Sequence, residues 1–169
     1  MTFAALFPGQ GSHTVGMASS FYASSAAARA VLDEAEAAFP GLLELMFEGP
    51  LDALTLTANQ QPALVAAGAA AFAAWREAGG AEPVVTAGHS LGEFTAHVAR
   101  GALPLADAVR LVHARGQYMQ DAVPAGEGAM AAILKLEEAH VRRLCSDAAG
   151  RGDAPVEIAN VNAPGQVVV

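Results

Sequence analysis

Positive charge is scarce in this sequence of 169 residues. Lys and Arg together number 9 against 17 Asp and Glu, which gives a formal net charge of -8, and Lys135 is the single lysine. Surfaces that bind nucleic acids or anionic lipids need clustered basic side chains. The composition therefore predicts a protein that binds neither nucleic acid nor a membrane surface.

Cysteine and long apolar runs are also in short supply. Cys145 is the only cysteine, so no internal disulfide is possible, and we expect a small buried side chain in a reducing compartment. The longest apolar stretch, residues 63–75, is shorter than the roughly 18 to 20 residues that span a bilayer. The N-terminus lacks the basic region of a signal peptide. We therefore expect a soluble, cytoplasmic protein.

Apolar side chains, in contrast, are abundant and make up 53% of the residues. Short apolar runs at residues 3–7 and 84–87 predict buried strands. Helical periodicity and breaker residues predict helices at residues 26–39, 42–47, 93–100 and 105–123. Asn59 is the predicted N-cap of a further, alanine-rich helix that ends near residue 78. This succession of elements predicts an α/β fold with a buried core.

The C-terminal part of the sequence has a different pattern. Residues 128–134 predict a strand, residues 137–149 an amphipathic helix, residues 156–161 a second strand and residues 166–169 the start of a third. This β-α-β-β order is the first part of a ferredoxin-like unit.

The most informative stretch is Gly88-His89-Ser90-Leu91-Gly92, which joins a predicted strand to helix-forming sequence. A GxSxG motif often arises by chance, but between a strand and a helix it is typical of a nucleophile elbow. Small residues two positions before and after the serine allow the sharp turn that exposes its hydroxyl. Ser90 is therefore the predicted nucleophile, with the Leu91 N–H as an oxyanion donor and His89 lining the pocket.

A second glycine-rich loop, residues 9–13, follows the first predicted strand. Glycines on both sides of Gln10 let the backbone approach a ligand at the carboxyl end of the strand, where open α/β sheets bind their ligands. The alternative is a plain connector between a strand and a helix.

Arg115 is an anomaly in the predicted helix at residues 105–123. It shares the stripe that should face the interior with Ala108, Leu111, Val112 and Met119. A buried guanidinium is costly unless it is paired. Two interpretations stay open: a structural ion pair, for example with Glu93, or a clamp for an anionic ligand, because a guanidinium matches a carboxylate.

Five motifs occur along the chain in one order: Phe7-Pro8-Gly9-Gln10-Gly11-Ser12, Asn59-Gln60-Gln61-Pro62-Ala63, Gly88-His89-Ser90-Leu91-Gly92-Glu93, Arg115-Gly116 and Asn162-Ala163-Pro164-Gly165-Gln166. Together they resemble the malonyl-CoA:acyl carrier protein transacylases, the acyltransferases of fatty acid and polyketide synthesis. The resemblance implies an α/β-hydrolase-like core with a mostly parallel sheet at residues 1–124. It also implies the start of an inserted ferredoxin-like subdomain at residues 125–169, with both parts incomplete.

The resemblance assigns the catalytic roles to residues already singled out. Ser90 would accept the malonyl group as an ester, and the Gln10 backbone N–H would join that of Leu91 in the oxyanion hole. Transfer would be ping-pong, from coenzyme A to the serine and then to the phosphopantetheine thiol of acyl carrier protein.

The same resemblance assigns the substrate-binding site. Arg115 would bind the free carboxylate of the malonyl group, with His89 beside it, and Asn162 would shape the acyl pocket or support the catalytic histidine. Malonyl-CoA is then the substrate and acyl carrier protein the partner, with no metal or other cofactor. Malonyl and methylmalonyl specificity are both compatible with these residues.

The sequence departs from the family pattern in several places. His13 stands where the family usually has Gln, and Phe94 where Tyr is common. None of the 5 histidines matches the catalytic histidine of the family, the general base, which is expected beyond Val169. We therefore expect a truncated or cleaved N-terminal portion, or one half of a two-chain assembly, that is completed by a C-terminal half.

Two other functions compete with the acyltransferase interpretation. A GxSxG motif is equally typical of serine esterases and thioesterases of the α/β-hydrolase type, although Arg115 and the Gln10 loop favour a transferase. The other alternative is a non-catalytic fragment that serves as an assembly piece.

Overall fold

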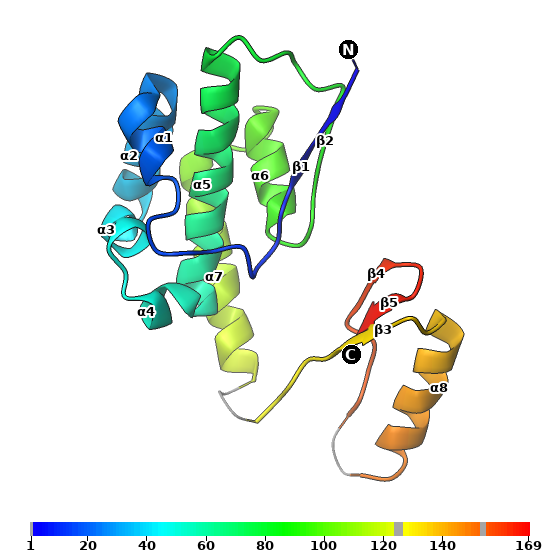
Figure 1. The fold of residues 1–169 in the computed structure, drawn as a ribbon. Coiled ribbons are helices and arrows are strands. Elements are labelled where there is room, and N and C mark those ends of the chain that lie inside the picture. The colour runs from blue at the N-terminus through cyan, green and yellow to red at the C-terminus, as the bar shows by residue number, and fades with distance from the viewer. Residues whose placement is uncertain (1, 124–126, 153–154) are drawn as a thin grey trace. The chain divides into compact units, whose positions relative to one another are not determined.

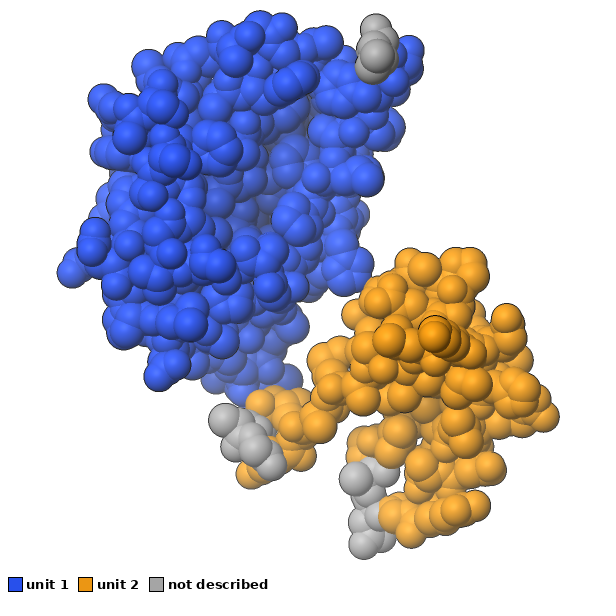
Figure 2. Space-filling view, viewed as in Figure 1, with its two compact units in different colours: residues 1–122 blue, residues 123–169 orange. Residues whose placement is uncertain are grey.

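A computed structural model describes residues 2–123, 127–152 and 155–169 (Figure 1). They form two compact units, residues 1–122 and 123–169 (Figure 2). The boundary predicted between residues 124 and 125 lies outside the described residues. Each unit combines a sheet with one or more helices, and the sheet of the first unit is parallel, which confirms the α/β class.

The first unit contains a two-stranded parallel sheet. β1 (Ala4–Phe7) pairs with β2 (Val85–Gly88), with Phe7 opposite Gly88 at the carboxyl end. Both strands lie where the apolar runs predicted them. α5 (Thr57–Glu77) and α6 (Gly92–Ala99) lie on one side of the sheet (Figure 1), and Phe7 packs edge-on against Phe72 of α5. Because both strands end at the same edge, the loops that follow them start side by side.

α5 is the central helix of the first unit. α2 (Ala26–Ala38) and α7 (Leu105–Ala122) pack against it. Three shorter helices also contact it: α1 (Ser19–Ser24), α3 (Leu42–Phe47) and α4 (Leu51–Thr55). The small side chains of α5 allow these close approaches, and ten of its residues are buried. None of the described helices is long and apolar enough to cross a membrane.

α5 begins earlier than the sequence predicted. Its first residue is Thr57, so Asn59 is not the N-cap but lies inside the helix, where its Nδ2 donates to the Ala53 carbonyl at 2.9 Å. α1 and α4, of 6 and 5 residues, were not predicted, because each spans less than two turns of a periodic pattern. α3 is equally short but was predicted, because Pro40-Gly41 and Gly49-Pro50 delimit it in the sequence.

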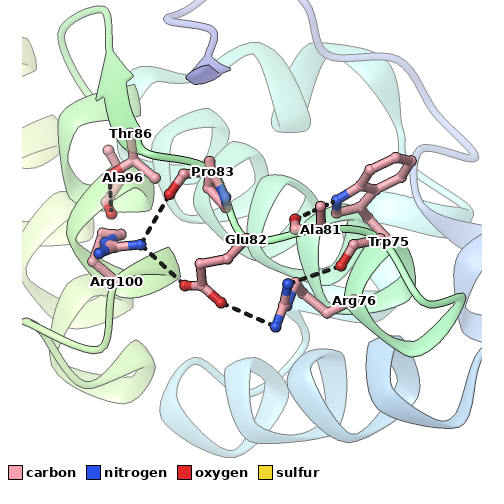
Figure 3. A network of polar contacts seen from close by, with 9 residues as sticks. Trp75, Arg76, Ala81, Glu82, Pro83, Thr86, Ala96 and Arg100 are labelled. Atoms are coloured by element: carbon pink, nitrogen blue, oxygen red, sulfur yellow. Dashed lines mark hydrogen bonds and ion pairs between the residues drawn. The ribbon is translucent and has the colours of Figure 1, made fainter. Parts of the chain in front are cut away.

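A surface network holds the segment that leads into β2 (Figure 3). The Glu82 carboxylate accepts from Arg76 at 2.9 Å and from Arg100 at 3.0 Å, and Thr86 Oγ1 donates to the Ala96 carbonyl at 3.1 Å. These contacts connect the end of α5, the start of β2 and α6. Because the charged side chains are 40% to 59% exposed, each ion pair contributes about 0–1 kcal/mol.

The face of this sheet opposite α5 and α6 carries exposed apolar side chains. Leu6 is 75% exposed and Val85 is 52% exposed, and the register of β1 and β2 places both side chains on this face. Parallel sheets in proteins are normally covered on both faces. We call the surface formed by Leu6 and Val85 the open sheet face.

The second unit is a three-stranded antiparallel sheet with one helix. β5 (Gln166–Val168) lies between β3 (Ala132–Leu134) and β4 (Asn160–Ala163). α8 (Glu138–Ala149) packs on this sheet through Val141 and Cys145, which contact Val167. Cys145 is 7% exposed, as expected for a small apolar core residue.

The strands of the second unit are shorter than predicted. β3 covers three residues of the predicted 128–134, and β4 begins at Asn160 although the prediction placed the strand at residues 156–161. Both strands pair with β5, which has only three residues and so offers few backbone partners. Val156 and Ile158 lie before β4 and pack, partly buried, against the small core.

Candidate active site

Ser90 lies on a strained turn between β2 and α6. Its φ angle is 55°, in the left-handed region that residues with a side chain rarely adopt. The strand ends at Gly88 and the helix begins at Gly92, so the turn is only three residues long. Ser90 is exposed at its apex. This is the geometry of a nucleophile elbow.

The two glycines of the motif are required by close packing. A Cβ atom at Gly88 would overlap the backbone of Gly92, and a Cβ atom at Gly92 would overlap the Phe7 carbonyl at the end of β1. Neither neighbour is a flexible side chain that could move aside. The turn therefore depends on the absence of both side chains.

The first turn of α6 leaves one backbone donor next to the serine. The N–H groups of Gly92, Glu93 and Phe94 donate to the carbonyls three residues earlier, at 2.9, 3.2 and 3.0 Å. The Leu91 N–H has no hydrogen-bond partner among the described residues. An uncommitted N–H at the positive end of a helix is suited to stabilise an oxyanion.

The loop with Gln10 lies against the elbow. A Cβ atom at Gly9 would be 2.7 Å from His89 Nδ1 and 3.0 Å from the His89 carbonyl oxygen, so the loop backbone packs directly on the residue before the serine. Gly11 has a φ angle of 101°, which turns the chain immediately after Gln10. The structure thus brings the two predicted oxyanion segments together.

Arg115 reaches Ser90 from α7. Its Nη2 donates to Ser90 Oγ at 2.9 Å, and its Nη1 donates to Gln61 Oε1. Gln61 is fully buried in α5. No ion pair of Arg115, with Glu93 or with another acidic residue, is found in the part of the chain that the structure describes. The guanidinium therefore keeps its positive charge among neutral partners.

The stripe predicted for α7 is partly wrong. Leu111 and Met119 are 51% and 43% exposed, and Arg115 is half-buried. The residues of α7 that face the core are Leu105, Ala108, Val109, Val112 and Gly116. Arg115 thus lies at the margin of the buried stripe, a position that lets an arginine bury its aliphatic part and keep its charged end accessible.

Gly116 explains how Arg115 comes within reach of Gln61. A Cβ atom at Gly116 would be 2.5 Å from Ala58 Cα, so α7 touches the backbone of α5 at this point. His113 reinforces the contact, because its Nδ1 lies 2.8 Å from the Ala58 carbonyl. Pro62 has no N–H to donate to that carbonyl, so the histidine takes the place of the missing helical hydrogen bond.

The sequence analysis missed two residues of this site. Gln61 was quoted only as part of a motif, and His113 was considered only as a general base. No local pattern distinguishes either residue, since their partners Arg115 and Ala58 lie 54 and 55 residues away in the sequence.

An apolar cavity of about 550 Å³ adjoins Arg115. It is lined by Phe94, Leu111, Ala114, Arg115, Tyr118, Met119 and Ala122. Asn162, the last predicted site residue, is exposed on β4 of the second unit. Among the described residues no group of three or more His, Cys, Asp or Glu could hold a metal ion.

The model of the acyl transferase domain family matches residues 4–169. The chain belongs to this family. It is 47% identical over 169 residues to the malonyl CoA-acyl carrier protein transacylase of Escherichia coli (strain K12), and covers 54% of that protein. The corresponding protein of Bacillus subtilis (strain 168) is 46% identical over 165 residues and is covered to 51%. The chain thus spans about half the length of these relatives.

Solved structures of acyl transferases support the same assignment. An acyl-carrier-protein S-malonyltransferase from Burkholderia pseudomallei matches with a TM-score of 0.90 and 50% identity, over 99% of this chain and 54% of that one. A malonyl-transacylase in complex with a type II polyketide synthase acyl-carrier protein matches with a TM-score of 0.90 and 40% identity, over 99% of this chain and 54% of that one.

Proposed function

We propose that this chain is the nucleophile-bearing portion of a malonyl-CoA:acyl carrier protein transacylase. Ser90 Oγ attacks the thioester carbonyl of malonyl-CoA, the C–S bond breaks, and the coenzyme A thiol leaves with the proton passed through a general base. The phosphopantetheine thiol of acyl carrier protein then attacks the seryl ester, and Ser90 recovers its proton. The similarity to malonyl CoA-acyl carrier protein transacylases and the exposed serine on its strained turn support this assignment.

The observation that carries the proposal is the uncompensated charge of Arg115 beside Ser90. A malonyl ester on Ser90 would place a free carboxylate three carbon atoms from Oγ, within reach of the guanidinium. Gln61 orients the side chain without neutralising it, which leaves the charge for the substrate. His89 is proposed to line this substrate-binding site, and Asn162 is proposed as a substrate-binding residue of the second unit.

The oxyanion hole is proposed to consist of two backbone groups. The free Leu91 N–H and the Gln10 N–H belong to segments that pack together at Gly9 and His89. Donors on two rigid segments are already in place when the tetrahedral intermediate forms, so their reorganisation costs little.

The finer fold assignment is part of the same proposal. We assign residues 1–124 to an α/β-hydrolase-like core and residues 125–169 to a ferredoxin-like subdomain. A strand, a nucleophile elbow and a helix support the first assignment, and the β-α-β-β order supports the second.

We further propose that a C-terminal half, in cis or as a second chain, completes the site. The open sheet face supports this, because an exposed parallel sheet with Leu6 at 75% exposure is expected to pack against further protein. The general base is assigned to that half, because the Ser90 hydroxyl contacts Arg115 here and Arg115 is a poor base.

The test is the intact mass of the chain after exposure to malonyl-CoA. An increase in mass by one malonyl group, absent in Ser90→Ala, would support the proposal. Co-expression with the C-terminal half of the Escherichia coli relative should make this acylation faster. Hydrolysis of uncharged acyl esters without transfer would favour the esterase alternative. No adduct in either preparation would favour the non-catalytic assembly piece.

A further inference from the structure

His13 is the inward-facing residue of the loop that carries Gln10. Residues 10–12 and 14–16 are exposed, whereas His13 is half-buried. Its Nε2 lies 3.0 Å from Thr55 Oγ1, and the amide nitrogen of Gln60 lies 2.8 Å from its Nδ1 and 3.2 Å from its Nε2. The loop is therefore connected through one side chain to both α4 and α5.

The directions of these hydrogen bonds follow from the groups that take part. Thr55 Oγ1 donates to the Leu51 carbonyl at 2.8 Å, so it accepts from the His13 Nε2–H. Nδ1 of the neutral ring then accepts from the Gln60 amide, which is the shorter of the two contacts. Both ring nitrogens are thus occupied, which excludes His13 as the general base for Ser90.

Gln60 depends on His13 for its polar contacts. The residue is 4% exposed, and its Oε1 is buried without a hydrogen-bond partner among the described residues. A buried amide that loses its last partner is destabilised by its full desolvation cost. Removing His13 would leave both polar atoms of the Gln60 amide buried without a hydrogen-bond partner. The contact between His13 and Gln60 is therefore expected to hold the loop more firmly than an exposed hydrogen bond between uncharged side chains would.

We propose that His13 is a positioning residue that fixes the Gln10 N–H for catalysis. Gln60 and Gln61 are consecutive residues of α5, and they hold the Gln10 loop and Arg115 respectively. One turn of α5 thereby fixes the positions of both the proposed oxyanion donor, the Gln10 N–H, and the proposed carboxylate-binding residue, Arg115. This inference rests on the proposed function, because the role of Gln10 is part of it.

The structural arm of the test measures amide hydrogen exchange of residues 9–16 in this chain. His13→Leu and Gln60→Leu should each raise exchange in this loop by about tenfold, and the double variant should add little more, because both remove one interaction. His13→Gln should restore protection, since its carboxamide both accepts and donates. Thr55→Val removes only the hydroxyl that accepts from His13 Nε2, so it should raise the exchange of the loop less. His97→Leu, at an exposed histidine, is the matched control.

The functional arm measures the rate of malonyl adduct formation on Ser90. His13→Leu should slow it about tenfold with unchanged half-saturation and unchanged preference for malonyl over acetyl, and His13→Gln should recover it. Unchanged loop exchange in His13→Leu, or His13→Gln behaving like His13→Leu, would overturn the inference. If the unaltered chain forms no adduct, either alone or co-expressed with the C-terminal half, the proposed function fails, while the exchange data still decide whether His13 anchors the loop.

Discussion

The elbow that carries Ser90 and the arginine beside it are adjacent in space but built in different ways. The elbow is made by five consecutive residues and one neighbouring strand end. Arg115 is placed by a glycine contact between two helices and oriented by Gln61, 54 residues earlier in the sequence. The elbow has no room for an added Cβ atom. The placement of Arg115 depends on hydrogen bonds, which one substitution can weaken without unfolding the chain. The following experiments test this difference.

The largest effect is expected from Gly88→Ala. The new Cβ would overlap the backbone of Gly92, and backbone cannot move aside as a side chain can. The free energy of unfolding of the first unit, measured by urea denaturation, should fall by at least about 3 kcal/mol. Gly152→Ala is the control, because that position has open space and an ordinary φ angle. Equal effects at the two glycines would contradict the steric account of the elbow.

Arg115→Ala should act on selectivity more than on stability. Loss of the guanidinium should lower the preference for malonyl-CoA over acetyl-CoA in adduct formation by about a hundredfold, since a charge-paired contact is worth roughly 2–3 kcal/mol. Arg110→Ala, on the exposed side of the same helix, is the control. Unchanged selectivity would rule out the clamp.

Gln61→Leu should produce a weaker form of the same defect. The guanidinium remains but loses the acceptor that orients it, so the preference for malonyl should fall by about tenfold. Adduct formation with malonyl-CoA and acetyl-CoA in competition measures this ratio. The exposed Gln117→Leu is the control. An effect as large as that of Arg115→Ala would mean that orientation, rather than charge, decides the selectivity.

The smallest effect is expected from Glu82→Gln. This change removes two exposed ion pairs, with Arg76 and Arg100, that hold the segment before β2 (Figure 3). The free energy of unfolding should fall by no more than about 1 kcal/mol, and less at high salt. A loss of several kcal/mol would show that the elbow depends on this distant surface network and not on local packing alone.

Helices bounded by clear breaker residues were predicted best. α2, α6, α7 and α8 begin and end within one residue of the predicted limits, because several turns of apolar periodicity and clear breaker residues agree there. α5 is different, since Asn59 has the chemistry of an N-cap but contributes to a bond with Ala53 instead. The strands of the second unit were predicted too long, because pairing rather than propensity limits them.

Ser90 with its two glycines could be found in the sequence because every constraint on it is local: small neighbours, a strand before it and a helix after it. The neutral partners of Arg115, and the link from His13 through Gln60 to α5, could not be found in this way. They depend on how closely α7 and the loop after β1 approach α5. Only the packing of the folded chain sets those distances. The sequence alone therefore determined the turn that carries Ser90, the predicted nucleophile, and the tertiary structure decided what holds the groups around it.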